Sequence, residues 1–451
     1  MKRLLAGVLF LLAACDRWDE FGDLARCREL GRCDGGTAGG GEGTSGGGAS
    51  AGGGGATAGG GAAAGGSATA GGGATAGGGA TAGGAMLPQG VVALWKRSGA
   101  ATSAIAGDQN TVLWLGSTGI GPARVRLGSD GGVIVQDTGS SPPVVGAYQL
   151  GNDTIACASS PTTHHVQVFE GTSATPVRTI VLPFEIDTCN LFTEADGGVR
   201  FAAWGGPFGT LGAVDGDLDG GFIAYPTVGS CTDGGFYPHR IRQSPYLGAG
   251  VLTGQYFGNC TYNGQGLSST PVLRGFATRT QPGFLPYDFV ATGARPVSVR
   301  HGSAHYLARR DTATQVIERL VPSSPGFVQE AQFDMSGVLN EVNELVSTGD
   351  GGVLLAVGTQ RTGNSTFFPH DVMVVPVTTE GAFVAGQKFI IDNPADEVVD
   401  SAVWLAGPRL LAVGGSCLAR LPDGGAAPAS LLCAGDAGSA FVVFIDPTRL
   451  P

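Results

Sequence analysis

The chain has 451 residues, 80 of them glycine, and a formal net charge of -11 at neutral pH. Apart from Lys2, its only lysines are Lys96 and Lys388, and no run of basic residues occurs. Nucleic acid and anionic lipid headgroups are therefore disfavoured as partners, because binding to either requires clustered positive charge.

The N-terminus has the pattern of an export signal over residues 1–14. Lys2 and Arg3 precede an apolar run over 4–12, and two small residues, Ala13 and Ala14, precede Cys15. Cations followed by a short apolar stretch and small residues are typical of a cleaved signal peptide. The run is too short to cross ~30 Å of hydrocarbon. Cleavage before Cys15 removes two positive charges and changes the net charge from -11 to -13.

The ending Leu12-Ala13-Ala14-Cys15 resembles the lipobox of bacterial lipoproteins. The resemblance implies that the Cys15 thiol carries lipid, with palmitate among the acyl chains, and anchors the mature protein in a bilayer of the cell envelope. Asp16 at the next position favours inner-membrane retention in enterobacterial lipoproteins, a rule that need not hold in other lineages. We expect the outer membrane or cell surface rather than the periplasmic face of the inner membrane. The alternative is an ordinary secretory signal with an incidental cysteine.

The remaining eight cysteines indicate an oxidising compartment, because an even number without metal-site spacing favours disulfides. None forms a C-x-x-C motif and no histidine is interleaved, which argues against zinc. They fall into neighbouring couples along the chain: Cys27/Cys33, Cys157/Cys189, Cys231/Cys260 and Cys417/Cys433. These couples are the predicted disulfides, although sequence alone cannot prove the connectivity.

Two segments follow the lipidated cysteine before any folded domain is expected. Residues 15–34 form a short acidic segment, and residues 35–85 contain almost only Gly, Ala, Thr and Ser. The second segment cannot bury enough apolar surface to offset the entropy of ordering, so it is predicted to be a disordered linker with an r.m.s. span of roughly 40 Å. It either lifts the folded domain away from the membrane or reflects repeat slippage without a function.

Residues 86–451 are predicted to form an all-β domain. Short apolar runs alternate with turns rich in Gly, Asp and Asn, and no segment keeps helical periodicity for three turns. Seven units begin with similar strands, at intervals of 43, 44, 52, 55, 47 and 57 residues. The first apolar residues of these units are Val112, Ile155, Val199, Val251, Tyr306, Val353 and Leu410. Seven units of four short strands indicate a β-propeller; two β-sandwich domains are the alternative.

The clearest unit, 344–391, contains the turn Asp350-Gly351-Gly352 followed by an aliphatic strand. It resembles the repeats of bacterial seven-bladed propeller proteins. The whole layout, with lipobox, glycine-rich linker and repeats, resembles uncharacterised lipoproteins abundant in myxobacteria, and this resemblance implies no substrate. The strands at 91–95 and 441–445 lie at opposite ends of the domain, and pairing them would close the ring.

Residues that could carry chemistry are few. The sequence has no nucleophile elbow, phosphate-binding loop or zinc-protease motif. His301 and His305 are four residues apart, which in an extended chain separates them by about 13 Å. Three tryptophans could form a glycan-stacking surface, but their positions in apolar strands favour core packing: Trp114, Trp204 and Trp404.

The segment from Asp215 through Asp217 to Asp219 and Gly220 matches the first six positions of a calcium-binding loop. The pattern then departs, because Pro226 stands where such a loop carries its bidentate glutamate. Calcium is therefore a possible ligand of Asp215, Asp217 and Asp219, and an acidic hairpin turn is the alternative. No other cofactor is expected.

Three functions remain open at this level. The favoured one is a membrane-tethered, non-enzymatic propeller that binds a protein or a glycan. The second is a propeller hydrolase or lyase that acts on an extracellular polymer, which requires two or more acidic side chains converging at the centre of the ring. The third is a structural spacer without a ligand.

Overall fold

The computed structural model describes residues 87–449 apart from loop segments. The segments outside the description are 99–103, 108–110, 116–122, 129–131, 138–143, 161, 172, 174, 194–197, 208, 244–249, 268–269, 280–284, 292–294, 312–313, 324–325, 336, 350–351, 362–369, 379–388, 392–395, 419–430 and 433–438. The predictions for residues 1–85, including those for Cys15, Cys27 and Cys33, lie outside the described residues, as does Cys433.

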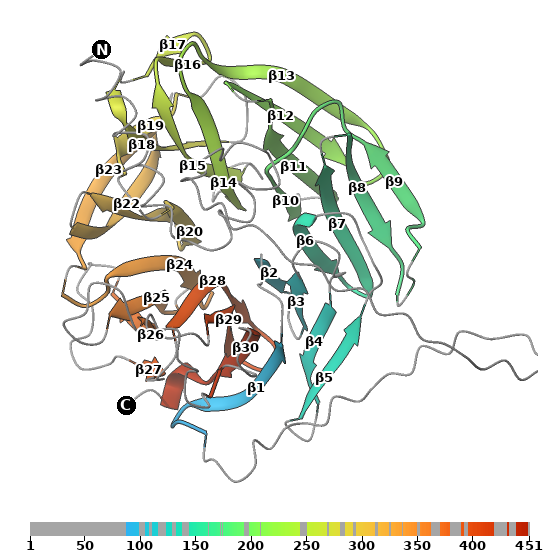
Figure 1. Ribbon diagram of the computed structural model, residues 1–451, viewed down its shortest axis with the longest axis vertical. Coiled ribbons are helices and arrows are strands. Elements are labelled where there is room, and N and C mark those ends of the chain that lie inside the picture. The colour runs from blue at the N-terminus through green and yellow to red at the C-terminus, as the bar shows by residue number, and fades with distance from the viewer. Residues whose placement is uncertain are drawn as a thin grey trace, which may run out of the picture. The chain divides into compact units, whose positions relative to one another are not determined.

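The described chain is built from β-strands, and its one helical element is the short 3-10 turn η1 (Pro447–Arg449). No described helix is long and apolar enough to cross a membrane. The strands form seven antiparallel sheets, which confirms the prediction of seven four-stranded blades (Figure 1).

The first three blades follow chain order. Their strands are β2 (Ala104–Gly107), β3 (Thr111–Leu115), β4 (Ala123–Leu127) and β5 (Val133–Asp137) in blade 1; β6 (Val144–Leu150), β7 (Asp153–Ser160), β8 (Thr163–Phe169) and β9 (Arg178–Val181) in blade 2; and β10 (Thr188–Thr193), β11 (Val199–Gly205), β12 (Thr210–Asp217) and β13 (Phe222–Cys231) in blade 3.

Blades 4 to 6 continue the same order. Their strands are β14 (Gly235–Gln243), β15 (Gly250–Gly258), β18 (Thr270–Arg279) and β19 (Tyr287–Val290) in blade 4; β20 (Val297–His301), β21 (Ala304–Asp311), β22 (Thr314–Ser323) and β23 (Gly326–Asp334) in blade 5; and β24 (Glu341–Ser347), β25 (Leu354–Arg361), β26 (His370–Val377) and β27 (Phe389–Ile391) in blade 6.

Blade 7 closes the ring by combining the two ends of the domain. Its strands are β28 (Asp396–Leu405), β29 (Leu410–Leu418), β30 (Ser439–Ile445) and β1 (Val91–Ser98). The N-terminal strand β1 pairs antiparallel with β30, with Trp95 opposite Val442. This confirms the predicted pairing of the end strands, which joins the two ends of the domain within blade 7.

The first strand of each blade surrounds the centre, as Figure 1 shows. These strands contact one another around the ring in the order β28, β2, β6, β10, β14, β20, β24 and back to β28. Apolar side chains fill the space between consecutive blades, so the core is a series of separate clusters rather than one centre. Each blade is therefore held to its neighbours by apolar packing.

A glycine in the second strand faces a bulge in the first strand of three blades. Gly254, Gly358 and Gly415 lie opposite bulges in β14, β24 and β28. A Cβ atom at any of the three would collide with a backbone carbonyl of the first strand. In β25 this glycine follows an aliphatic residue, as Val357-Gly358. The glycine is needed because the backbones of the first and second strands come very close at the bulge.

Blade 4 contributes an extra hairpin to the sheet of blade 3. Strands β16 (Cys260–Tyr262) and β17 (Gln265–Gly266) lie between β15 and β18 in sequence, yet β16 pairs with the end of β13. The ring of Tyr262 is buried in the cluster that holds Trp204, Phe236 and Tyr256. The hairpin thus locks blades 3 and 4 together, a feature that the repeat analysis did not predict.

Two of the predicted disulfides are present in the described structure. Cys157–Cys189 joins β7 of blade 2 to β10 of blade 3, with Cα atoms 6.4 Å apart. Cys231–Cys260 joins β13 to the extra hairpin, with Cα atoms 4.0 Å apart. Cys417 on β29 is also disulfide-bonded; its predicted partner lies outside the description.

Candidate functional site

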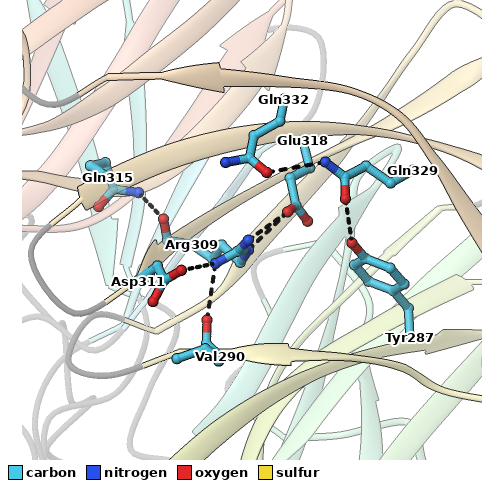
Figure 2. Close-up of polar contacts among 8 residues, drawn as sticks. All are labelled: Tyr287, Val290, Arg309, Asp311, Gln315, Glu318, Gln329 and Gln332. Carbon is cyan, nitrogen blue, oxygen red and sulfur yellow. Dashed lines mark hydrogen bonds and ion pairs between the residues drawn. The ribbon is translucent and has the colours of Figure 1, made fainter.

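The junction of blades 4 and 5 carries the polar cluster drawn in Figure 2. Strands β21 and β22 form a tight hairpin in which Leu307 lies opposite Glu318. Because side chains alternate across a strand, His305, Leu307 and Arg309 share one face. Leu307 and Leu320 pack there against Val251, Ala277 and Phe289 of blade 4, so this face of blade 5 lies against blade 4.

Arg309 is the central charge of the junction. Its Nε and Nη2 atoms donate to Oε1 of Glu318 at 3.0 and 2.7 Å, and its Nη1 donates to the carbonyl of Val290 at 3.1 Å. Oδ2 of Asp311 lies 3.5 Å from Nη1 of Arg309. The guanidinium carbon of Arg309 lies 5.7 Å from the centre of the Phe289 ring. One side chain of blade 5 therefore bonds to both blades (Figure 2).

Burial alone would lower the pKa of Arg309, but the hydrogen bonds and the negative charge of Glu318 outweigh it and raise the pKa above its usual value. Arg309 is therefore a fixed cation. A buried ion pair of this kind is held by mutual neutralisation, because neither charge is favourable alone in the interior.

Tyr287 and two glutamines form the outer part of the cluster. The hydroxyl of Tyr287, on the last strand of blade 4, donates to Oε1 of Gln329 at 3.0 Å. Nε2 of Gln329 donates in turn to Oε1 of Gln332 at 3.1 Å. Both glutamines are exposed, whereas Tyr287 is half-buried. A chain of hydrogen bonds thus crosses from the rim of blade 4 to the rim of blade 5.

Burial, and then the negative charge of Glu318, raises the pKa of Tyr287 to about 12. The phenol therefore stays protonated at physiological pH and acts as a neutral hydrogen-bonding group. Glu318 itself is fully buried, and its Oε2 atom has no hydrogen-bond donor among the described residues. The cluster thus holds one unused buried acceptor behind an exposed hydrogen-bonding surface.

His305 lies on the same face of β21 as Arg309, and Leu307 stands between them along the strand. The imidazole is fully buried, lies edge-on to the ring of Phe327 and finds no hydrogen-bond partner for either nitrogen among the described residues. The guanidinium of Arg279 covers the same ring at 5.9 Å. Burial, followed by the charges of Arg300 and Arg279, lowers the pKa of His305 to about 3.

These groups suit recognition better than proton transfer. An acid–base catalyst works best with a pKa near the operating pH. Tyr287 titrates near 12 and His305 near 3, so neither exchanges a proton readily around neutrality. Arg309 is occupied by Glu318. What the junction offers to a ligand is a set of neutral donors and acceptors on rigid strands.

The three aspartates of the predicted calcium loop lie at the β12–β13 turn and bond to different partners. Asp215 pairs with Arg200 at 3.1 Å, and Asp219 pairs with Arg178 of blade 2 at 2.7 Å. Oδ1 of Asp217 accepts from the backbone N–H groups of Asp219 and Gly221 at 3.0 and 2.9 Å, which stabilises the turn. The described residues contain no group of three His, Cys, Asp or Glu placed to hold a metal. Calcium binding stays a prediction.

Trp204 is fully buried and Trp404 packs against a core cluster, as their apolar surroundings predicted. The side chain of Trp114 lies outside the description. His301 and His305 are not in one extended segment, because a tight turn at Gly302 folds β20 onto β21. His301 bonds to Ser347 of blade 6 at 2.8 Å, whereas His305 packs on the blade 4 side. The two imidazoles therefore belong to different interfaces.

Two acidic side chains lie on neighbouring inner strands, Glu344 on β24 and Glu397 on β28, and both are fully buried. The hydroxyl of Ser401 donates to Oε2 of Glu344 at 3.2 Å, which joins blade 7 to blade 6. A hydrolase or lyase would need carboxylates of this kind to converge at the centre. That alternative stays a prediction.

The chain resembles solved β-propeller structures at low sequence identity. No protein-family model matches the sequence, and no curated protein matches it. Among solved structures, the β-propeller domain of Myceliophteria thermophila Cps50 (Swd1) is 11% identical, with a TM-score of 0.46 over 79% of this chain and 99% of that one. The WD40 domain of Toxoplasma gondii coronin is 7% identical, with a TM-score of 0.43 over 80% and 87%. At such values the likeness carries no argument about function, and the propeller assignment depends on the sheet topology.

Proposed function

We propose that this chain is a lipid-anchored envelope or surface protein whose propeller binds a protein or a glycan without catalysing a reaction. Cys15 would fix the protein in the membrane, and residues 35–85 would act as a flexible spacer. The lipobox-like ending and the spacer composition support the tether. The disulfides Cys157–Cys189 and Cys231–Cys260 support export, because such bonds persist in oxidising compartments.

The observation that carries the binding role is the hydrogen-bond chain from Tyr287 to Gln329 and Gln332. It spans two blades, it is exposed at its glutamine end, and the Arg309–Glu318 pair behind it is neutralised internally. Binding sites commonly combine a rigid scaffold with a few placed polar groups of this type. The outer membrane or cell surface is the expected location, with the periplasmic face of the inner membrane as the alternative.

Capture from intact envelopes tests this proposal. The full-length protein and its Gln329→Ala/Gln332→Ala variant would be cross-linked in membranes and purified in parallel. We expect a protein or polysaccharide component that copurifies with the wild type and is reduced at least fivefold with the variant. The same copurifying material in equal amounts from both proteins, or none from either, would contradict a binding role for this junction.

A further inference from the structure

A β-bulge places the side chains of Gln329 and Gln332 together. On β23, Gln332 lies opposite Glu318 and Gln329 lies opposite Leu320, so Glu330 is an extra residue in the ladder. In a regular strand, residues three apart point to opposite faces. The bulge removes this alternation, and the two amides lie within 3.1 Å of each other. Bulges often re-aim a side chain at a functional site.

The paired amides keep unused hydrogen-bonding groups. Gln332 uses only its carbonyl oxygen within the cluster, so both N–H bonds of its amide are without a partner among the described residues. Gln329 uses one of its two amide N–H bonds and one lone pair of its oxygen. Each of these groups belongs to a planar side chain with fixed directions. The surface therefore presents alternating donors and acceptors a few ångströms apart.

The charge around this surface is balanced. Glu318 is paired with Arg309, and Glu330, an exposed charge on β23, is paired with Arg319 at 2.6 Å. A second exposed charge, Asp334, ends the same strand. The charges of Glu318 and Glu330 are therefore each neutralised by an arginine, which favours a neutral ligand next to the two glutamines. The half-buried ring of Tyr287 packs on the buried ring of Phe289, with centroids 5.8 Å apart, which fixes the position of the Tyr287 ring. A partly exposed aromatic ring beside planar amides suits a sugar, whose C–H groups pack on the ring while its hydroxyls bond to the amides.

From these observations we infer that the Tyr287–Gln329–Gln332 surface binds the hydroxyl groups of a neutral glycan. This inference depends on the binding role proposed above and names the class of ligand. The Gln332 amide donates to one hydroxyl and the free lone pair of Gln329 accepts from its neighbour. Tyr287 holds Gln329 in the orientation that this requires. Glu318 lies behind Tyr287 and stays paired with Arg309.

Isothermal titration of the detergent-solubilised full-length protein tests the inference with three neutral probes, cellohexaose, maltohexaose and chitohexaose, and one acidic probe, hexagalacturonate. We expect at least one neutral hexasaccharide to bind. Gln329→Ala and Gln332→Ala should each weaken that binding at least tenfold. Tyr287→Phe, which keeps the ring and loses the hydroxyl, should weaken it less than either. Gln265→Ala, an exposed glutamine on β17, serves as the matched control and should bind as the wild type does.

Three results would overturn the inference. One is no binding of any neutral probe. Another is equal affinity of the wild type and the Gln329→Ala and Gln332→Ala variants, and the third is preferential binding of hexagalacturonate. If the envelope-capture experiment still yields a protein that depends on the same two glutamines, the binding role stands and only the glycan assignment fails. Thermal unfolding of each variant confirms that it is folded.

Discussion

The ring of Tyr262, carried by a hairpin of blade 4, lies parallel to that of Trp204 in blade 3, with centroids 6.5 Å apart. The Tyr262 side chain is buried among apolar groups of both blades, and its hydroxyl receives a long hydrogen bond from Thr278 at 3.4 Å. An insertion between two strands of one blade therefore completes the core of its neighbour.

Replacement of Tyr262 tests how much this hairpin contributes to the stability of the protein. Removing a large buried ring leaves a cavity, so Tyr262→Ala should lower the free energy of unfolding by about 3–5 kcal/mol. Tyr262→Phe keeps the ring and should cost about 1 kcal/mol or less, because only a weak hydrogen bond is lost. Urea denaturation measures both values. Equal costs for the two variants would show that the hydroxyl, rather than packing of the ring, holds the hairpin.

The Arg309–Glu318 pair should be strongly coupled. Glu318→Gln removes the buried counter-charge of Arg309 and leaves the more exposed Asp311 at 3.5 Å, so it should destabilise the protein by up to about 3–5 kcal/mol. The double replacement Arg309→Met/Glu318→Leu removes both charges and should cost less than Glu318→Gln alone. A double-mutant cycle, with the matching single variants followed by denaturant unfolding, measures the coupling. Additive effects would contradict an ion pair between the two strands of this hairpin.

Acid should destabilise the protein in part through His305. The folded-state pKa of this group is about 3, whereas an unfolded histidine titrates near 6.5. Between these values the unfolded chain takes up a proton that the folded protein does not, so stability is lost as the pH falls below about 6.5. His305→Leu removes this effect. The loss of stability between pH 7 and pH 4.5 should therefore be smaller in the variant by up to about 2–3 kcal/mol, measured by urea unfolding at each pH.

Chelation tests the predicted calcium loop. Asp215 and Asp219 are paired with arginines, and Asp217 stabilises the turn. If the segment is only an acidic hairpin turn, the alternative interpretation, the unfolding temperature should be the same in excess chelator and in millimolar calcium. A rise in that temperature with calcium, lost in Asp217→Asn, would show that the three aspartates leave these partners and bind the ion. Binding to the folded state alone raises the unfolding temperature.

Much of the fold could be predicted because each blade of a propeller repeats the same local pattern of strands and turns. Of the seven predicted unit starts, six lie in the second strand of a blade, and Val353 directly precedes β25. A turn precedes each start and an apolar strand follows it, so the period is visible without an alignment. The pairing of Cys157 with Cys189 followed from their closeness in sequence, which in a propeller brings neighbouring blades together.

The polar junction escaped sequence analysis for a physical reason. Arg309 and Glu318 lie on adjacent strands, and only the tight register of the β21–β22 hairpin places them on one face. Pairing the two strands about residues 312–313 would have revealed this signal. The bulge at Glu330 has no such signature, because nothing local marks an extra residue in the ladder. The expected spacing of His301 and His305 was wrong for a similar reason, because it assumed an extended chain and a tight turn at Gly302 lies between them.

Lipid attachment at Cys15 is the claim on which the tethered role depends, and metabolic labelling with an alkyne analogue of palmitate tests it most directly. The wild-type protein should be labelled and should partition with membranes. Cys15→Ser should lose the label and retain its signal segment, whereas Cys157→Ser/Cys189→Ser should keep the label and act as a control for the other thiols. Label that persists in Cys15→Ser, or a wild-type protein released unlabelled from the membrane fraction, would contradict the account.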